Sequence, residues 1–299
     1  MRIAVRFAAS LVIVGLTTAW GLSAPARGQS TPSPEEAALL ESILESTKAY
    51  CRKLDNFAFE IACREVVTED LAGKPKVRMV PQPGEPGMAP TMSVANSGTR
   101  NTYIYNYHLI REQRISRETR ILVERNRRRL MASNVRPEAL RFHFENMTFG
   151  PIDLFGVVGR LRHEYRVVGR ETFKGEKAII VEAVPNVQTI DDNPGAKVWV
   201  REGDSAVLKI EWDPATLPEY EEIKAAAAAM DETPVISLIT EYGIEKDGFR
   251  FPSRFFIREA YLQAKTRKTE IASEVTVEYR DYKFIRIVPD FVDDDGETP

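Results

Sequence analysis

From Thr102 onward the chain alternates between apolar and polar residues with the period of a β-strand. Near the C-terminus, for example, Val275 and Val277 alternate with Glu274, Thr276 and Glu278. One apolar face and one polar face is the pattern of an antiparallel sheet that is buried on one side. The strands expected from this pattern and from turn signals cover residues 102–108, 119–124, 141–145, 163–170, 177–184, 197–201, 206–212, 235–246, 249–264 and 270–288.

Two segments have the period of a helix instead. Ser33-Pro34-Glu35-Glu36 is typical of a helix start, with a capping serine, a proline in the first turn and acids at the positive end. That helix is expected to run to about Leu54. A second helix is predicted near 218–230, beginning at Pro218 and ending before Thr233-Pro234, and its alanine run favours a helix.

These elements predict an α+β fold that is mainly antiparallel β. A long meander with one apolar face must have that face covered. We therefore expect a curved sheet, or half-barrel, covered on its concave face by the N-terminal helix and the helix near 218–230. Residues 29–289 are expected to form a single domain.

Two segments of this chain do not fit the sheet. Residues 71–100 contain five of the chain's 18 prolines, and this composition favours a long loop over a continuous strand ladder. Residues 290–299 are acidic and are expected to form a disordered tail.

Residues 1–28 have the order of regions found in a secretory signal peptide. Arg2 and Arg6 precede an apolar run from Phe7 to Trp20, and small residues around Ala24 follow. The apolar run is short for a membrane span, and no second long apolar run occurs. The sequence therefore predicts cleavage, export to the periplasm or beyond, and a mature chain without a transmembrane segment.

Charge argues against a nucleic-acid partner. Removing Arg2, Arg6 and Arg27 with the signal leaves 38 of the 41 basic residues against 44 acidic ones, a net charge of −6. Nucleic-acid binding needs a broad basic face. The short basic run from Arg125 to Arg129 is interpreted as a charged strand end or turn.

Two cysteines, Cys51 and Cys63, are present. In an oxidising compartment an isolated pair usually forms a disulfide, and their spacing fits neither a zinc site nor a CxxC redox pair. A Cys51–Cys63 bridge is therefore predicted, joining the first helix to the first strand, in which Phe57, Phe59 and Ile61 alternate with Ala58 and Glu60.

No catalytic constellation is found. The histidines His108, His143 and His163 lack metal-ligand spacing, and no nucleophile elbow, phosphate-binding loop or dinucleotide fingerprint occurs. Each histidine is expected to be a strand-surface or hydrogen-bonded structural residue. The strand carboxylates are expected on the solvated face. No enzyme activity, cofactor or metal is predicted.

The middle of the chain resembles a known superfamily. The order is a strand at Val167-Val168-Gly169-Arg170-Glu171, a strand from Ala178 that ends in Pro185, a strand with an aromatic residue (Lys197-Val198-Trp199-Val200), and the strand Val207-Leu208-Lys209-Ile210-Glu211-Trp212. This order resembles the LolA/LolB-like periplasmic proteins, which include outer-membrane lipoprotein-sorting proteins. The resemblance extends over residues 100–288. It implies an incomplete barrel with a cavity for lipid acyl chains.

Two functions remain open at this point. One is a binding module that holds a lipid, a lipoprotein acyl chain or another apolar ligand in the half-barrel. The other is an envelope interaction, scaffold or sensor protein with a filled core, whose tyrosines and Pro-rich loop contact other envelope proteins. The residues predicted to line a pocket in the first case are Trp199, Trp212, Tyr220, Ile223 and Met230, although side chains at helical spacing are also typical of a dry core.

Overall fold

The computed structural model describes residues 33–73, 75–80, 91–96, 98–133, 135–137, 139, 147–186 and 194–289. The predicted signal peptide (1–28), the acidic tail (290–299) and the predicted strand at 141–145 lie outside the described residues. None of the helices in the described part of the chain is both long and apolar enough to cross a membrane.

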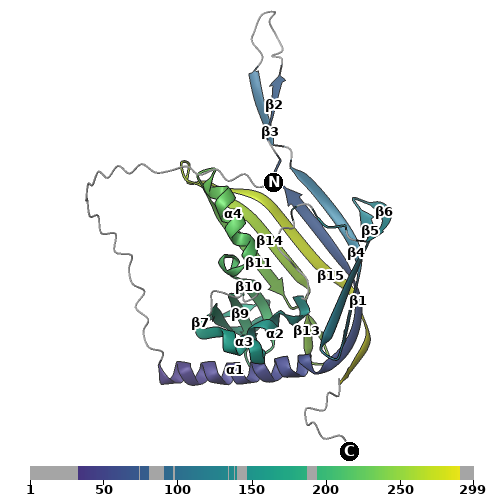
Figure 1. Ribbon diagram of the computed structural model, residues 1–299, viewed down its shortest axis with the longest axis vertical. Helices are drawn as coiled ribbons and strands as arrows, with labels where there is room; N and C mark the ends of the chain where they lie inside the picture. The colour runs from purple at the N-terminus through teal and green to yellow at the C-terminus, as the bar shows by residue number, and fades with distance from the viewer. Residues whose placement is uncertain are drawn as a thin grey trace, which may run out of the picture.

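The main feature of the fold is an open, curved, antiparallel sheet of eleven strands (Figure 1). Their order is β6-β5-β4-β1-β15-β14-β11-β10-β9-β8-β7. The fold class predicted from the sequence is confirmed. The strands are β1 (Phe57–Leu71), β4 (Thr99–Glu112), β5 (Ile115–Arg125), β6 (Arg128–Ser133), β7 (His163–Phe173), β8 (Glu176–Pro185), β9 (Ala196–Arg201), β10 (Val207–Trp212), β11 (Glu232–Glu241), β14 (Arg254–Gln263) and β15 (Thr269–Pro289).

The sheet consists of two local meanders joined by long-range pairs. Strands β7 to β11 follow each other along the chain, as do β4 to β6. Strand β15 joins the two meanders, because it pairs with β1 on one side and with β14 on the other. The N-terminal and C-terminal parts of the described chain therefore share one continuous sheet.

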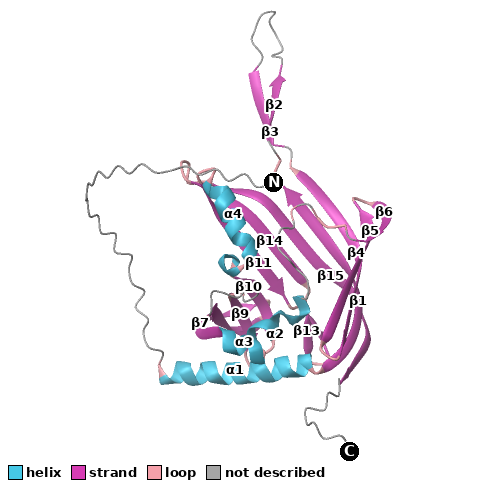
Figure 2. Cartoon of the chain, in the orientation of Figure 1, coloured by secondary structure: helices cyan, strands magenta, loops and turns pink. Residues whose placement is uncertain are grey.

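The helices lie on the concave side of the sheet and at its lower end in the view of Figure 2. Helix α4 packs on β11, and α1 packs on α2 and β7. At the start of α1, Ser33 and Glu36 form a reciprocal capping box. The bounds are α1 (Pro34–Asp55), η1 (Met147–Phe149), α2 (Gly150–Phe155), α3 (Val157–Arg162), η2 (Pro214–Thr216) and α4 (Pro218–Ala228).

One hydrophobic core unites the inner face of the sheet with α1, η1 and α2. Phe149 stacks on Phe59 of β1, and Leu154 and Phe155 of α2 are fully buried. Gly150 allows this approach, because a Cβ there would lie 2.7 Å from the Tyr242 hydroxyl and 3.1 Å from Trp212. The segment 149–156 thus fills the lower part of the half-barrel.

The prediction of a loop over residues 71–100 is wrong in part. Strands β2 (Pro75–Val80) and β3 (Thr91–Asn96) form an antiparallel hairpin that projects from the body (Figure 1). Pro75 occupies the first strand position, where a missing N–H is tolerated, and the other prolines fall between the two strands. Proline content therefore did not exclude a ladder here.

The two long strands predicted at 235–246 and 249–264 are each interrupted. β12 (Ile244–Lys246) and β13 (Phe249–Phe251) form a separate two-stranded sheet beyond β11 and β14. The breaks fall at Gly243 and Pro252, and the Gly243 N–H donates to Ser253 Oγ at 3.1 Å. The chain bends there because proline cannot continue the ladder.

The predicted disulfide is absent: Cys51 and Cys63 are both free and buried. Cys51 Sγ donates to the Pro151 carbonyl oxygen at 3.2 Å. The two residues lie on opposite sides of the turn after α1, and Cys63 lies roughly 20 Å up β1 from that turn at about 3.3 Å per residue. A bridge needs Cα atoms within about 7 Å of each other. An expected oxidising compartment and an isolated pair of cysteines were therefore not sufficient grounds for predicting a disulfide.

Candidate functional site

Six apolar residues form a continuous strip across the concave face of the sheet. The strip runs over four neighbouring strands in register: Leu238 pairs with Ile257, Ile257 with Val275, and Phe255 with Val277. Every member is at most 2 % exposed. This apolar strip comprises Leu238, Phe255, Ile257, Val275, Val277 and Val67.

Residues that pair across neighbouring strands form a row on the sheet, and each row of the strip continues into polar or tyrosine side chains on β1 or β4. Val275 pairs with Glu69, which pairs with Asn101. In the next row Val67 pairs with Tyr103. In these two rows the concave face is therefore amphipathic, since it changes from the apolar strip to Glu69 of β1 and to Asn101 and Tyr103 of β4.

Helix α4 borders the apolar side of this face. Ile223 is 3 % exposed and belongs to the core, and Tyr220 is half-buried. Met230 lies beyond the end of α4 and is 64 % exposed. Of the three residues predicted near 218–230, Ile223 thus packs in the concave core, Tyr220 is half-buried on the same helix, and Met230 is exposed beyond the helix end.

The two predicted tryptophans lie on opposite faces of the sheet. Trp212 faces the concave core, and its Nε1 donates to Thr240 Oγ1 at 3.0 Å. Trp199 packs in a separate small cluster with Ala178 and Leu208. The predicted pocket residues therefore do not converge on one site.

Trp199 is the floor of a shallow groove on the other face. Its indole N–H donates to Glu171, and the Lys209 ammonium lies 3.7 Å from its ring centroid. The groove has a volume of about 400 Å³, with Ile180 and Lys197 among its lining residues. The tryptophan is only 5 % exposed, so its edge and one ring face are already occupied.

A second group of residues on the concave face was not predicted. The Glu65 carboxylate, fully buried, accepts from Arg120 Nε at 3.0 and 3.1 Å. Arg120 also donates to Glu118 at 2.8 Å, and Glu118 accepts from the Tyr107 hydroxyl at 2.8 Å. Tyr279 completes the group, packing edge-on against Tyr107. We call Glu65, Tyr107, Glu118, Arg120 and Tyr279 the buried ion-pair cluster.

Burial dominates the electrostatics of this cluster. It raises the pKa of Glu65 to about 6, against the opposing effect of the Arg120 charge. Burial also works against the charge of Arg120, but the Glu65 and Glu118 carboxylates raise its pKa. Two acids around one arginine leave the site with an excess negative charge when all three are ionised.

Glu69, four residues further along β1 and on the same face as Glu65, has a different role. It accepts from Asn101 Nδ2 at 3.1 Å, from the Tyr103 hydroxyl at 3.2 Å and from the Ala139 backbone N–H. The Tyr105 hydroxyl donates to the Val135 carbonyl at 2.9 Å. These bonds hold the segment containing Val135 and Ala139 against the concave face.

Two expectations about polar residues are corrected by this arrangement. Carboxylates were expected on the solvated face, yet Glu65 and Glu69 are 0 % exposed. Tyrosines were expected as contact surfaces, yet Tyr103, Tyr105 and Tyr107 are at most 4 % exposed. The signal was present in the sequence, since both glutamates share the strand phase of Ile61 and Val67.

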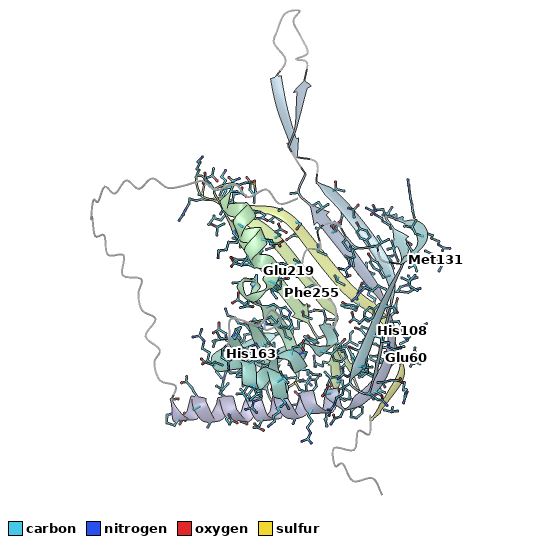
Figure 3. The ribbon with its side chains drawn as sticks, in the orientation of Figure 1. Glu60, His108, Met131, His163, Glu219 and Phe255 are labelled. Carbon is cyan, nitrogen blue, oxygen red and sulfur yellow. The ribbon has the colours of Figure 1, made fainter. Side chains whose placement is uncertain are left out.

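The two described histidines have structural partners, as predicted (Figure 3). His108 Nε2 lies 2.9 Å from Glu60 Oε1. The His163 ring nitrogens lie 2.9 Å from the Gly159 carbonyl and 3.1 Å from that of Pro194. The described residues hold no group of three or more His, Cys, Asp or Glu that could bind a metal ion.

No family model matches the chain, and no curated protein matches it. Among solved structures it is similar to a DUF1329 family protein from Desulfovibrio piger, with a TM-score of 0.34, 10% identity and coverage of 82% of this chain and 92% of that one. A putative outer membrane lipoprotein-sorting protein domain from Vibrio parahaemolyticus gives 0.34, 12%, 82% and 93%. A LolA superfamily protein from Nitrosomonas europaea gives 0.31, 14%, 84% and 94%.

Proposed function

We propose that this chain is an exported, non-enzymatic binding protein of a bacterial envelope that holds a lipid or a lipoprotein acyl chain on its concave face. The observation that carries the proposal is the amphipathic face itself. An apolar strip over β11, β14 and β15 runs in register into polar and aromatic residues of β1 and β4. An amphiphile has the same division between tail and head group.

The placement of the helices supports the same reading. Among the described elements, α4 packs on β11, and α1 packs on α2 and β7. Strand β11 carries Leu238, so α4 packs at the β11 end of the strip. Because every residue of the strip is at most 2 % exposed, an acyl chain would bind there by displacing the side chains that now cover the strip.

Native mass spectrometry on the mature chain purified from a periplasm, with lipid extraction, tests this proposal. We expect a bound acyl species at one per chain. Tyr220→Ala, at the border of the strip, is expected to lower occupancy several-fold. Met230→Ser and Trp199→Phe, an exposed residue and one on the opposite face, are matched controls expected to leave occupancy unchanged. An apo mass that stays unchanged on addition of phospholipid would overturn the proposal.

A second function is favoured by a different observation. Phe59, Phe149, Leu154 and Phe155 already fill the lower part of the half-barrel, as in a protein whose core serves stability alone. In that case the chain is an envelope interaction or sensor protein. An apo mass combined with a specific protein crosslinked in the periplasm would establish this alternative.

A further inference from the structure

The turn between β5 and β6 carries the basic run of the sequence, with arginine at four of the five positions from Arg125 to Arg129. Asn126 and Arg127 have φ values of 50° and 66°, the left-handed pair of a two-residue hairpin turn. The turn is fixed to β4, because the Asn126 N–H donates to the Thr102 carbonyl at 2.9 Å and the Thr102 N–H donates to Asn126 Oδ1 at 2.8 Å. The arginines are thus presented from a rigid support.

The positive charge at this turn is larger than that of its one acidic neighbour in the register, Glu124, which lies opposite Arg129. Arg125 is used internally, lying over the Tyr103 ring at 5.1 Å. Arg127, Arg128 and Arg129 are exposed, and within the part of the chain that the structure describes they form no ion pair. Three adjacent free guanidinium groups stand out on a chain whose formal net charge is −3.

Large apolar side chains follow directly on the same edge strand. Met131 is 86 % exposed and Leu130 is 40 % exposed. Figure 3 shows Met131 at the outer rim of the sheet, pointing away from the body. We call Arg127–Met131 the basic tip.

Protection of the sheet edge explains the arginines of the basic tip but not its exposed apolar residues. Strand β6 is an edge of the main sheet, and charges on an edge strand prevent it from pairing with other chains. An exposed methionine has the opposite effect, because an apolar edge promotes association. Arginine and methionine together therefore indicate a partner that takes both.

We propose that the basic tip docks on the surface of a bilayer rich in anionic phospholipid. The three arginines would bind lipid phosphates, and Met131 would enter the boundary between head groups and acyl chains. A nucleic acid would offer phosphates but no apolar layer for Met131, and a single turn is narrower than the basic face such a partner needs. The inference is independent of the concave ligand site, since the basic tip lies on the outer edge.

Vesicle co-sedimentation of the mature chain tests the proposal, with phosphatidylcholine vesicles containing 30% phosphatidylglycerol and with pure phosphatidylcholine. We expect binding to the anionic vesicles that weakens as salt rises. R127Q/R128Q/R129Q is expected to weaken it on the order of 100-fold, at roughly a fivefold effect for each charge. Met131→Ser should weaken binding severalfold at high salt, where the apolar contact dominates.

The matched control is R117Q/R170Q/K177Q, which removes the same charge from exposed positions elsewhere on the sheet. Equal losses for the two triple variants, or equal binding to both vesicle types, would overturn the proposal. So would tighter binding to duplex DNA than to the anionic vesicles at the same salt. Thermal unfolding of each variant checks that it is folded. Native mass spectrometry of Met131→Ser distinguishes the two proposals. Loss of vesicle binding with co-purified lipid retained would show that docking has failed while the concave site still binds its ligand.

Discussion

At the scale of single residues, the most informative feature is a pair of charges inside the sheet. Glu65 and Arg120 satisfy each other on the concave side of β1 and β5, with Glu118 as a second acceptor. Removing one partner from such a pair commonly destabilises a protein by about 3 kcal/mol, since the other charge remains buried. The cluster is therefore a structural element of the polar half of the concave face.

The raised pKa of Glu65 predicts an unusual pH dependence. The folded chain holds this proton up to about pH 6, whereas the ordinary value is 4.5. Between these values the folded state binds more protons than the unfolded state, so the free energy of unfolding should fall as pH rises through this window. The difference of about 1.5 units corresponds to about 2 kcal/mol. Urea unfolding of wild type and Glu65→Gln from pH 4 to 7 measures it, and equal slopes for the two proteins would contradict the assignment.

The cysteines give a second prediction at this scale. Burial raises the pKa of Cys63 to about 12 and that of Cys51 well above its ordinary value. At pH 8 the thiolate fraction of Cys63 is then about one in ten thousand. We expect Ellman's reagent to titrate neither thiol in the folded chain and both after denaturation without reductant. Two missing thiols in the denatured sample would mean that the pair is bridged after all.

At the scale of elements, α4 shows how local and tertiary information combine. Its start at Pro218 and its alanine run identified it as a helix, and Ile223 and Ala227 form its buried side. Only the fold shows that this side meets β11 and that the chain leaves the helix before Met230. The apolar helix face predicted from helical spacing therefore included Met230, which lies beyond the end of the helix.

The packing of α4 on the sheet predicts a clear difference between neighbouring substitutions. Ile223→Ala removes a side chain that is 3 % exposed and leaves a cavity in the core. We expect it to lower the free energy of unfolding by about 2 to 4 kcal/mol, as is usual for such core substitutions. Lys224→Ala, at the next and exposed position, should change it by less than about 0.5 kcal/mol. Chemical denaturation measures both. Equal effects would mean that α4 does not pack as described.

At the scale of the whole molecule, strand order determines where stability lies. β1 and β15 are central and paired on both sides, whereas β6 and β7 are the two edges of the main sheet. Hydrogen exchange followed by mass spectrometry should therefore find the slowest amides in β1 and β15 and the fastest strand amides in β6 and β7. Protection of β7 equal to that of β1 in a verified monomer would contradict this strand order.

The sequence by itself determined most of the elements whose signals act between neighbours along the chain, although it missed the β2–β3 hairpin and the breaks at Gly243 and Pro252. Period-two alternation identified most strands, and caps and prolines identified both long helices, because these signals act over a few residues. It also contained more than was drawn from it. Trp212 pairs with Ala196 across the β9–β10 hairpin, so these two side chains share a face. Trp199 is three residues after Ala196 on the same strand, so its indole lies on the opposite face.

Only the tertiary structure decided which faces are inside and which distant strands pair. β1 and β15 are joined across more than two hundred residues, and no local period encodes that partner. The ion pair between Glu65 and Arg120 and the free state of Cys51 and Cys63 depend on which segments lie beside β1. A side chain's environment is set by whatever segment covers it, and that segment can come from anywhere in the chain.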